Sequence, residues 1–560
     1  MSLTGLLDAV VADPAVAEAI EAVGSAALTI SGPPTLQPLA LAALASRTGR
    51  TVFAVTSTAR EAEDLLASLR CLLPPDQVAL YPGWETLPHE RLSPRADTVG
   101  QRLAVLRRLA HPSAEDTGSG PLAVVVAPVR SLLQPQVPGL GELTPVELRA
   151  GDTDCELEAI VTDLVNAGYT RNELVEKRGD FAVRGGILDV FPPTEEHPLR
   201  VEFWGEDVEE IRYFKVVDQR SLEIAPQGVW APPCRELLLT QEVQLRAAAL
   251  LAEYPELAEL LDPISRGEAV EGMESLAPVL VENLQTVLHD LPAGTHVVLC
   301  DPERIRSRAA DLVRTSAEFL DASWAAAAGG GRAPVDLGAA SLHDLDDVRV
   351  EAGELAIPWW GITALTADRE LLGDAVLTSA FAEATAYRGD TDTAMSQLRD
   401  WARDGWQLVL VFDGHGSAQR AAERLVAADV PARLSADVDD TTAIVQVTTG
   451  RLDRGLVAVS LKLAILTEAD LTGQRGLLAK DTGRMPSRRR NAIDPIQLAS
   501  GDFVVHEQHG VGRYVEMVRR TVNGGEREYL IIEYAASKRG QPGDRLFVPT
   551  DSLDQVTKYV

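Results

Sequence analysis

No Gly-Lys dipeptide occurs anywhere in the 560 residues. A P-loop needs GxxxxGK[ST] after its first strand, because the lysine and backbone N–H groups hold the nucleotide phosphates. The segment after the expected strand Ala27–Ser31 reads GPPTLQPLALA, in which Pro33, Pro34 and Pro38 have no N–H to donate. There is also no acidic box of the DEAD or DEAH kind. We therefore expect an α/β scaffold without a nucleotide, in preference to a cryptic ATP site.

Cysteine is scarce as well. Four cysteines are scattered without the paired spacing of a zinc site or a disulfide framework: Cys71, Cys155, Cys234 and Cys300. No apolar run is long enough to span a bilayer, and no signal peptide is recognisable. The sequence thus predicts a cytoplasmic protein with no bound metal and no membrane partner.

Basic residues are fewer than acidic residues. Lys and Arg number 52 against 83 Asp and Glu, which gives a net charge of -31. Such a chain repels phosphate backbones, so we expect protein partners and at most weak DNA binding. With 46% hydrophobic and 24% charged residues the chain is ordinary globular material, and its length predicts three to five domains.

Alternating strand and helix patterns predict a multidomain α/β protein. A first α/β domain is interrupted by an inserted α+β docking module, and two linkers flank a second, small α/β domain that precedes an all-β end. The expected segments are 1–132 (α/β domain, first part), 133–215 (docking module), 216–324 (α/β domain, second part), 325–334 (linker AAAAGGGRAP), 335–480 (middle α/β domain), 481–497 (basic linker) and 498–560 (all β).

Two short motifs suggest ligands but favour plainer interpretations. FDGHGS (412–417) sits at a strand-to-helix turn, where phosphates often bind, yet the third glycine of the dinucleotide fingerprint is missing. HEQHG (506–510) spaces its histidines three apart, whereas zinc-binding helices use HExxH. We expect a helix-capping turn at the first and a turn with surface histidines at the second.

Residues 168–220 are the most informative stretch of the chain. They pass three arginines and then short β patterns separated by Gly and Pro, with Phe191 and Trp204 expected to be exposed. No nucleophile, metal cluster or phosphate loop accompanies them. Arginine beside exposed aromatics is typical of a protein-docking surface.

This stretch closely resembles the UvrA-binding module shared by UvrB and the Mfd family of bacterial transcription-repair coupling factors. The resemblance implies that Arg171, Arg184 and Phe191, and secondarily Arg178, contact UvrA. Their expected role is pairing of the arginines with UvrA carboxylates, with Phe191 as an apolar anchor. Asp189 is expected to orient Arg184, and no catalytic residue is expected.

The end of the chain carries a second resemblance. GDFVVHEQHGVGRYVEM, EREYLIIEY and DRLFVPTDSLDQVTKYV resemble the small SH3/Tudor-like β-barrel with which Mfd proteins bind the RNA polymerase β subunit, and which CarD-like regulators share. An exposed strand here could be extended by a strand of the partner. The expected contacts are Val518, Arg519 and Arg520, against the alternative of a purely structural barrel with solvated arginines.

Together the resemblances cover essentially the whole chain in the Mfd order, including YPGWETLPHERLSP (81–94), which is too short for the damage-clamping hairpin of UvrB. They imply the N-terminal portion of such a protein, with a degenerate UvrB-like P-loop-type α/β domain and an uncovered UvrA site. ATP and Mg would belong only to the absent DNA translocase motor. The expected function is a non-catalytic adaptor that brings nucleotide excision repair to stalled transcription.

Two alternatives remain open at this point. One is a UvrB-type ATP-dependent damage-binding enzyme, which the missing Gly-Lys and hairpin oppose. The other is a CarD-like transcription regulator, which leaves the arginine module unexplained. The sequence assigns no role to the middle α/β domain.

Overall fold

The computed structural model describes residues 3–87, 89–113, 120–328, 341–364, 375–473, 500–506, 510–522, 525–533, 545–549 and 556–558. The chain divides into two compact units, Met1–Leu477 and Leu478–Val560. The predicted multidomain α/β organisation is confirmed, since the first unit alone contains two large mixed helix-and-sheet assemblies. Among its described helices, none is long and apolar enough to cross a membrane.

A seven-stranded parallel sheet forms the centre of the first unit, in the order β15-β1-β14-β13-β2-β4-β3. Its strands are short Val-, Ile- and Ala-rich runs, as expected for a parallel sheet covered on both faces. They are β1 Ala27–Ser31, β2 Val52–Thr56, β3 Val78–Leu80, β4 Val124–Pro128, β13 His296–Cys300, β14 Trp359–Thr363 and β15 Ala375–Thr378. Strand β13 joins the strands of the first region although it follows the insertion in sequence, and Val297 lies opposite Phe53 of β2.

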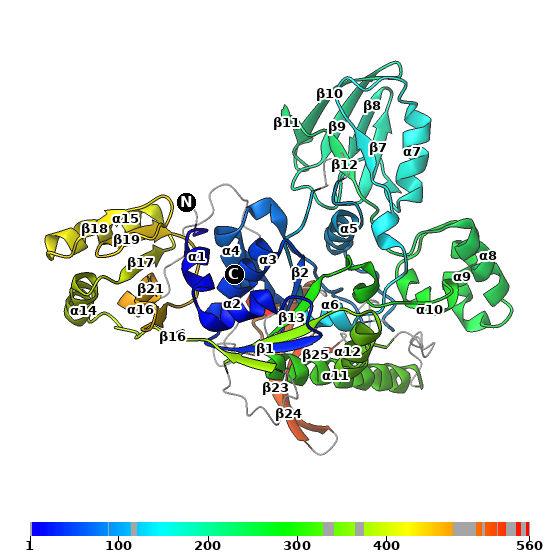
Figure 1. Cartoon of the computed structure of the whole chain (residues 1–560). Coiled ribbons are helices and arrows are strands. Elements are labelled where there is room, and N and C mark those ends of the chain that lie inside the picture. The colour runs from blue at the N-terminus through cyan, green and yellow to red at the C-terminus, as the bar shows by residue number, and fades with distance from the viewer. Residues whose placement is uncertain are drawn as a thin grey trace. The chain divides into compact units, whose positions relative to one another are not determined.

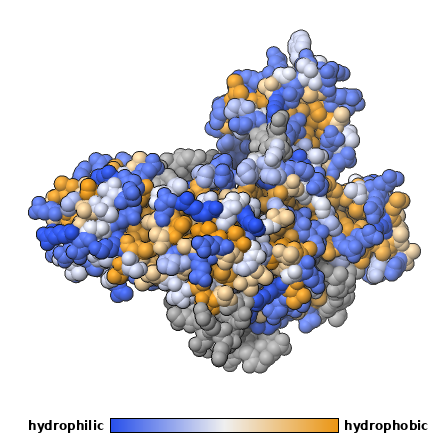
Figure 2. Space-filling view, in the orientation of Figure 1, coloured by the Kyte–Doolittle hydropathy of each residue, from blue (hydrophilic) through white to orange (hydrophobic). Residues whose placement is uncertain are grey.

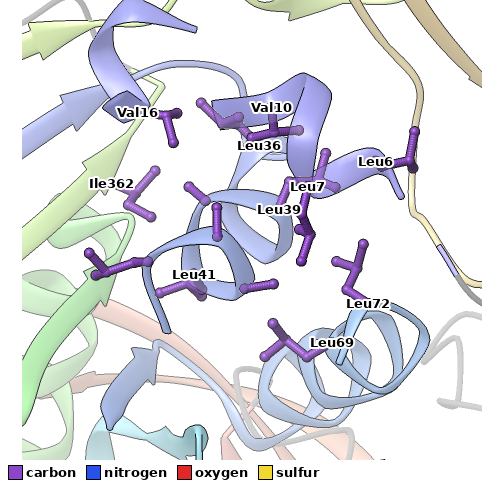
Figure 3. Packing of buried hydrophobic residues seen from close by; sticks show 14 of the residues in the cluster. Leu6, Leu7, Val10, Val16, Leu36, Leu39, Leu41, Leu69, Leu72 and Ile362 are labelled. Carbon is purple, nitrogen blue, oxygen red and sulfur yellow. The ribbon is translucent and has the colours of Figure 1, made fainter. Parts of the chain in front are cut away.

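Helices cover both faces of this sheet (Figure 1). Val52 and Ala54 of β2 belong to one core, and Phe53 and Val55 belong to the other, as strand alternation requires. The first core, seen in Figure 3, packs against α1 Leu6–Val11, α2 Pro14–Glu21, α3 Leu36–Thr48 and α4 Ala59–Leu72. The second packs against α5 Ala96–Ala110, α6 Val129–Leu133, α11 Pro302–Ala328 and α12 Leu345–Glu354.

Two predicted boundaries are wrong. Strands β14 and β15 lie within the expected middle domain 335–480, yet they flank β1 in the first sheet. A sequence pattern identifies a buried strand but not the sheet that the strand joins. The pattern alone could therefore not place β14 and β15 in the first sheet. The linker expected at 325–334 also begins too early, because α11 continues to Ala328, and the linker residues from 329 lie outside the described residues, as does the linker 481–497.

A second sheet has the order β16-β20-β21-β17-β19-β18. Its elements are β16 Ala382–Glu383, α14 Thr391–Arg403, β17 Gln407–Phe412, α15 His415–Ala427, β18 Ala432–Leu434, β19 Val445–Thr449, β20 Leu456–Ala458, β21 Leu463–Thr467 and α16 Glu468–Thr472. At the FDGHGS turn, Ser417 Oγ donates to the Gly414 carbonyl (2.9 Å), while Gly414, the residue before α15, makes no side-chain cap.

The insertion in the first domain is an α+β unit, as predicted. Helix α7 Leu157–Asn166 precedes a six-stranded sheet of β6 Thr170–Arg171, β7 Asp180–Arg184, β8 Ile187–Val190, β9 Leu199–Trp204, β10 Asp207–Phe214 and β11 Ser221–Ile224; β5 Val146–Leu148 pairs with β12 Val229–Ala231. The insertion therefore extends beyond the predicted end at 215. Strand β11 was missed because it is a mostly exposed edge strand without an apolar alternation.

Short helices complete the first unit. A separate small core forms around α8 Gln241–Leu250, α9 Ala258–Ser265 and α10 Ala277–Leu280. Five 3-10 turns lie between the larger elements: η1 Pro75–Gln77, η2 Leu140–Glu142, η3 Pro255–Leu257, η4 Met273–Leu276 and η5 Val287–Asp290.

In the second unit the described elements are all strands, in the order β25-β24-β23-β22-β26. They are β22 Phe503–His506, β23 Gly510–Val522, β24 Gly525–Glu533, β25 Arg545–Pro549 and β26 Val556–Lys558. Leu530 and Ile532 are buried on one side of β24, and Ile531 is buried as well. Within the described residues the pairs leave β25 and β26 as edges, so closure into an SH3/Tudor-like barrel stays a prediction.

One buried histidine predicts how stability depends on pH. His296 Nε2 accepts from the Gly24 N–H (3.1 Å) and Nδ1 lies 3.1 Å from the Gly294 carbonyl. Burial lowers the pKa of His296 below its ordinary value, so the unfolded chain takes up this proton first as the pH falls. Stability is then complete above about pH 6.5 and falls below it, by at most about 1.4 kcal/mol per pH unit. Urea unfolding at pH 7.5 and 5.5 should show a larger loss in the parent than in His296→Gln, and equal losses would contradict the assignment.

Candidate docking surfaces

At the expected nucleotide position, most of the backbone amides are absent or already engaged. Pro33 and Pro34 lack N–H groups, and the Gly32 N–H donates to the Thr363 carbonyl (2.9 Å). The Leu36 N–H donates to the Pro33 carbonyl (2.9 Å), inside the first turn of the helix. These contacts leave no cradle of free amides at the start of α3 of the kind that a P-loop offers to phosphates.

The six-stranded sheet of the insertion has one covered face. Leu199 and Val201 of β9 pack with Ile160 and Leu164 of α7, and Figure 1 shows α7 against that side of the sheet. The alternate residues of β9 point to the opposite side. We call this opposite side the outer face; it comprises Arg184, Ile187, Asp189, Arg200, Glu202, Trp204, Glu210, Arg212 and Ile224.

Apolar side chains are exposed on the outer face. Trp204 is 78% exposed, Ile224 52% and Ile187 37%, which confirms the predicted exposure of Trp204. Figure 2 shows hydrophobic and hydrophilic residues interleaved over the visible side of this insertion. An exposed tryptophan among charged groups is the composition of a binding surface.

Arg184 lies on this face, at the end of β7 and directly before the turn Gly185-Gly186. Gly185 has φ +61°, a conformation that glycine adopts without strain, and the turn places Arg184 opposite Ile187. Arg184 Nη2 donates to the Glu173 carbonyl. This hydrogen bond holds the exposed guanidinium at the edge of the outer face.

Phe191 is not exposed, contrary to prediction. Its ring is 6% exposed and packs with Val175, Ala182 and Phe214 in a small core on the outer side of the sheet. The Arg178 guanidinium lies 5.1 Å from the centre of that ring, and its Nε donates to the Glu195 carbonyl (2.9 Å). Phe191 is therefore buried, while Arg178 supports the loop through its Nε and stays partly exposed.

Arg171 and Arg184 do not share a face. Arg171 is exposed on the edge strand β6, where the register places it opposite Phe181. Phe181 belongs to the core that packs on α7, whereas Arg184 lies on the same side of β7 as Ala182. The two arginines thus offer an edge contact and a face contact, and they do not form one continuous row of guanidinium groups.

Asp180 organises the loop that carries these arginines, and sequence reasoning missed it. Its carboxylate accepts from the Asn172 side chain (2.8 Å) and from the backbone N–H groups of Glu176 (3.1 Å) and Lys177 (2.8 Å). A buried aspartate that satisfies backbone donors fixes loop geometry. The surrounding sequence KRGD does not indicate that the Asp180 carboxylate accepts hydrogen bonds from residues three to eight positions earlier in the chain.

Asp189 pairs with Arg200, not with Arg184 as predicted. Arg200 Nε and Nη2 donate to the two carboxylate oxygens at 2.7 and 2.8 Å, and this hydrogen bonding raises the pKa of Arg200. Arg212 makes a similar two-point contact with Glu210 (2.6 and 2.8 Å). The outer face therefore holds fixed ion pairs. The alternation in LRVEFW indicates that Arg200 and Glu202 share a face, but the partner of Arg200 depends on strand register.

In the second unit, strand β23 has a partly open edge. On one side it pairs with β24 from Arg513 to Val522, but on the other side β22 reaches only as far as Arg513. Within the described part of the unit, no strand pairs with the far half of β23 on that side. Val518 is half-buried in this half, and the side chains of Arg519 and Arg520 lie outside the described residues.

Comparison with protein families matches the two segments of the chain that carry these surfaces. The model of the UvrB interaction domain matches residues 146–232, and that of the CarD-like/TRCF RID domain matches residues 498–560. The first range contains the whole six-stranded sheet and its outer face. The second contains all the described strands of the second unit.

Whole-chain relatives agree with these matches. The transcription-repair-coupling factor of Mycobacterium tuberculosis is 45% identical over 100% of this chain and 46% of its own length, and that of Bacillus subtilis is 26% identical over 92% and 44%. The chain spans about half the length of the curated relatives that it matches. It is thus a homologue of part of the transcription-repair-coupling factors, with a UvrB interaction domain and a CarD-like/TRCF RID domain.

Proposed function

We propose that this chain acts as a non-catalytic adaptor, binding UvrA through the outer face and the RNA polymerase β subunit through the open edge of β23. By holding both, it recruits nucleotide excision repair to stalled transcription. The observation that carries the proposal is the outer face of the UvrB interaction domain. There an exposed Trp204 lies among arginines whose guanidinium groups are fixed by hydrogen bonds.

The proposed UvrA contact is led by Arg184, with Arg171 at the adjoining edge. Arg200 and Arg212 have their guanidinium groups paired already, so they contribute a fixed pattern of charge. Phe191 and Arg178 act behind the surface by holding the loop. Exposed arginine can pair with carboxylates of UvrA in two-point geometry, and Trp204 supplies the large apolar contact typical of energetic centres in interfaces.

The proposed polymerase contact is strand addition. The far half of β23 has unpaired backbone N–H and C=O groups along one side within the described residues. An extended strand of the β subunit could continue the sheet there, with main-chain hydrogen bonds giving affinity and Val518, Arg519 and Arg520 giving specificity. A CarD-like regulator would use the same edge but would leave the UvrB interaction domain without a role.

A UvrB-type ATP-dependent enzyme is less compatible with the first sheet. The start of α3 lacks a series of free amides, and the sequence lacks the phosphate-binding lysine. We therefore propose that this chain uses neither ATP nor Mg, and that it meets DNA at most weakly because of its negative charge.

The Val518→Glu substitution tests the polymerase contact. We expect binding to the isolated β subunit to weaken at least tenfold, because a carboxylate on the open edge must be desolvated beside the added strand. Biolayer interferometry measures the affinity, with Phe503→Glu as a matched control at an exposed apolar residue of β22. Loss of binding in the control and not in Val518→Glu would move the contact to β22.

A further inference from the structure

A cleft of about 210 Å³ lies where the nucleotide would be expected. It opens at the carboxyl ends of β2 and β13, with Thr56 and Cys300 in its wall, and it continues to Asp453 of the second sheet assembly. Ligands of open α/β sheets bind outside the carboxyl ends of the strands. The location is therefore that of a binding site, although the phosphate cradle is missing.

The charge of the cleft is opposite to that of a phosphate site. Four carboxylates line it, from Glu61, Asp64, Asp301 and Asp453, against one guanidinium, from Arg304. Arg304 pairs with Glu61, and Arg451 pairs with Asp64 (2.9 Å). Burial raises the pKa of Asp301, although Arg304, whose Nη1 lies 3.9 Å from the Asp301 carboxylate, opposes this. A nucleotide polyphosphate would be repelled here.

An unsatisfied hydroxyl gives independent evidence for a missing ligand. Thr35 lines the cleft and is 8% exposed, and its Oγ1 is buried without a hydrogen-bond partner among the described residues. Buried polar atoms are almost always paired, because leaving one unpaired costs free energy. A ligand that donates N–H groups would satisfy both this oxygen and the carboxylates.

We propose that this cleft binds an organic cation, through an ammonium or guanidinium group held by Asp301 and the Thr35 hydroxyl. The group could belong to a free polyamine or to a lysine or arginine side chain of a partner. In either case the cleft lies where an α/β sheet binds its ligand, but its charge is opposite to that of a phosphate site. This inference is independent of the adaptor function.

Isothermal titration calorimetry with the purified chain tests the proposal, using spermidine, Nα-acetyl-arginine amide and ATP as separate titrants. We expect saturable one-to-one binding of at least one cation and none of ATP. Asp301→Asn should weaken that binding at least tenfold, and asparagine tolerates the left-handed backbone at this position (φ +64°). Tighter binding of spermidine indicates a free polyamine, and tighter binding of the arginine amide indicates a partner side chain.

Asp163→Asn on the exposed surface of α7 is the matched control, since it removes the same charge from a chain of net charge -31. We expect it to leave cation binding unchanged. If Asp301→Asn does not fold, Thr35→Val removes only the hydroxyl and should also weaken binding. Equal weakening by Asp163→Asn, absence of saturable binding, or binding of ATP would overturn the proposal.

Discussion

Replacement of Glu236 by alanine should lower the free energy of local opening of α5 by about 3–5 kcal/mol, because it leaves the fully buried Arg102 without its ion-pair partner. Arg102 Nε donates to Glu236 Oε1 (2.5 Å) and its Nη1 donates to the Pro82 carbonyl (2.9 Å), while the guanidinium lies 4.4 Å from the centre of the Tyr81 ring. Amide hydrogen exchange across α5 measures the change directly.

The consequence extends to the UvrB interaction domain. Trp84 Nε1 also donates to Glu236 Oε1 (3.0 Å). Glu236 follows the domain in sequence, so its carboxylate connects the domain to Trp84 of the 81–94 segment and to Arg102 of α5. Gly100 of α5 lies against Pro193, where an added Cβ would come within 2.4 Å of a proline side-chain atom. Loss of Glu236 should therefore loosen the attachment of the domain as well.

Glu242→Ala is the control for this prediction. Glu242 pairs with Arg246 on exposed α8 (3.0 Å), and such pairs contribute roughly 0–1 kcal/mol. Glu236→Gln keeps an oxygen acceptor for Arg102 and should cost less than Glu236→Ala. A change below about 1 kcal/mol in Glu236→Ala would show that the buried pair does not anchor the helix.

Arg184→Ala should weaken UvrA binding by about 2–4 kcal/mol, or roughly 30- to 1000-fold. The side chain is exposed, is oriented by the Glu173 carbonyl, and lies on the face that carries Trp204. Arg171→Ala should cost less, because Arg171 lies at the edge and toward the other side of the sheet. Surface plasmon resonance with immobilised UvrA gives both values.

Arg220→Ala is the matched control, since its side chain is exposed in the same domain but precedes β11. Circular dichroism should show that all three variants keep the fold of the parent. If Arg184→Ala binds UvrA as the parent does while Arg220→Ala does not, the docking surface lies at the β10–β11 end and not on the outer face.

Much of the fold was predictable because its signals are local. The strand Ala27–Ser31 matches prediction residue for residue, since it is a compact apolar run. The exposure of Trp204 followed from its place beside Gly205 at a strand end. These features depend on neighbours in sequence, which a single chain displays.

The remaining features depend on residues far apart. Phe191 reads equally well as an exposed anchor or as a core residue, and only the packing of Val175 and Phe214 from other segments decides between them. The pairing of Asp189 with Arg200 depends on strand register, and β14 joins β1 across more than 300 residues of chain. No local pattern encodes such choices.

The central claim is that one chain holds both partners at once. Mass photometry of this chain with purified UvrA and RNA polymerase tests it most directly, using complexes formed pairwise and then together. The account predicts a ternary complex whose mass equals the sum of the three components, and its loss on Arg184→Ala without loss of the polymerase complex. Binding of either partner that excludes the other, or absence of any complex with UvrA, would contradict it.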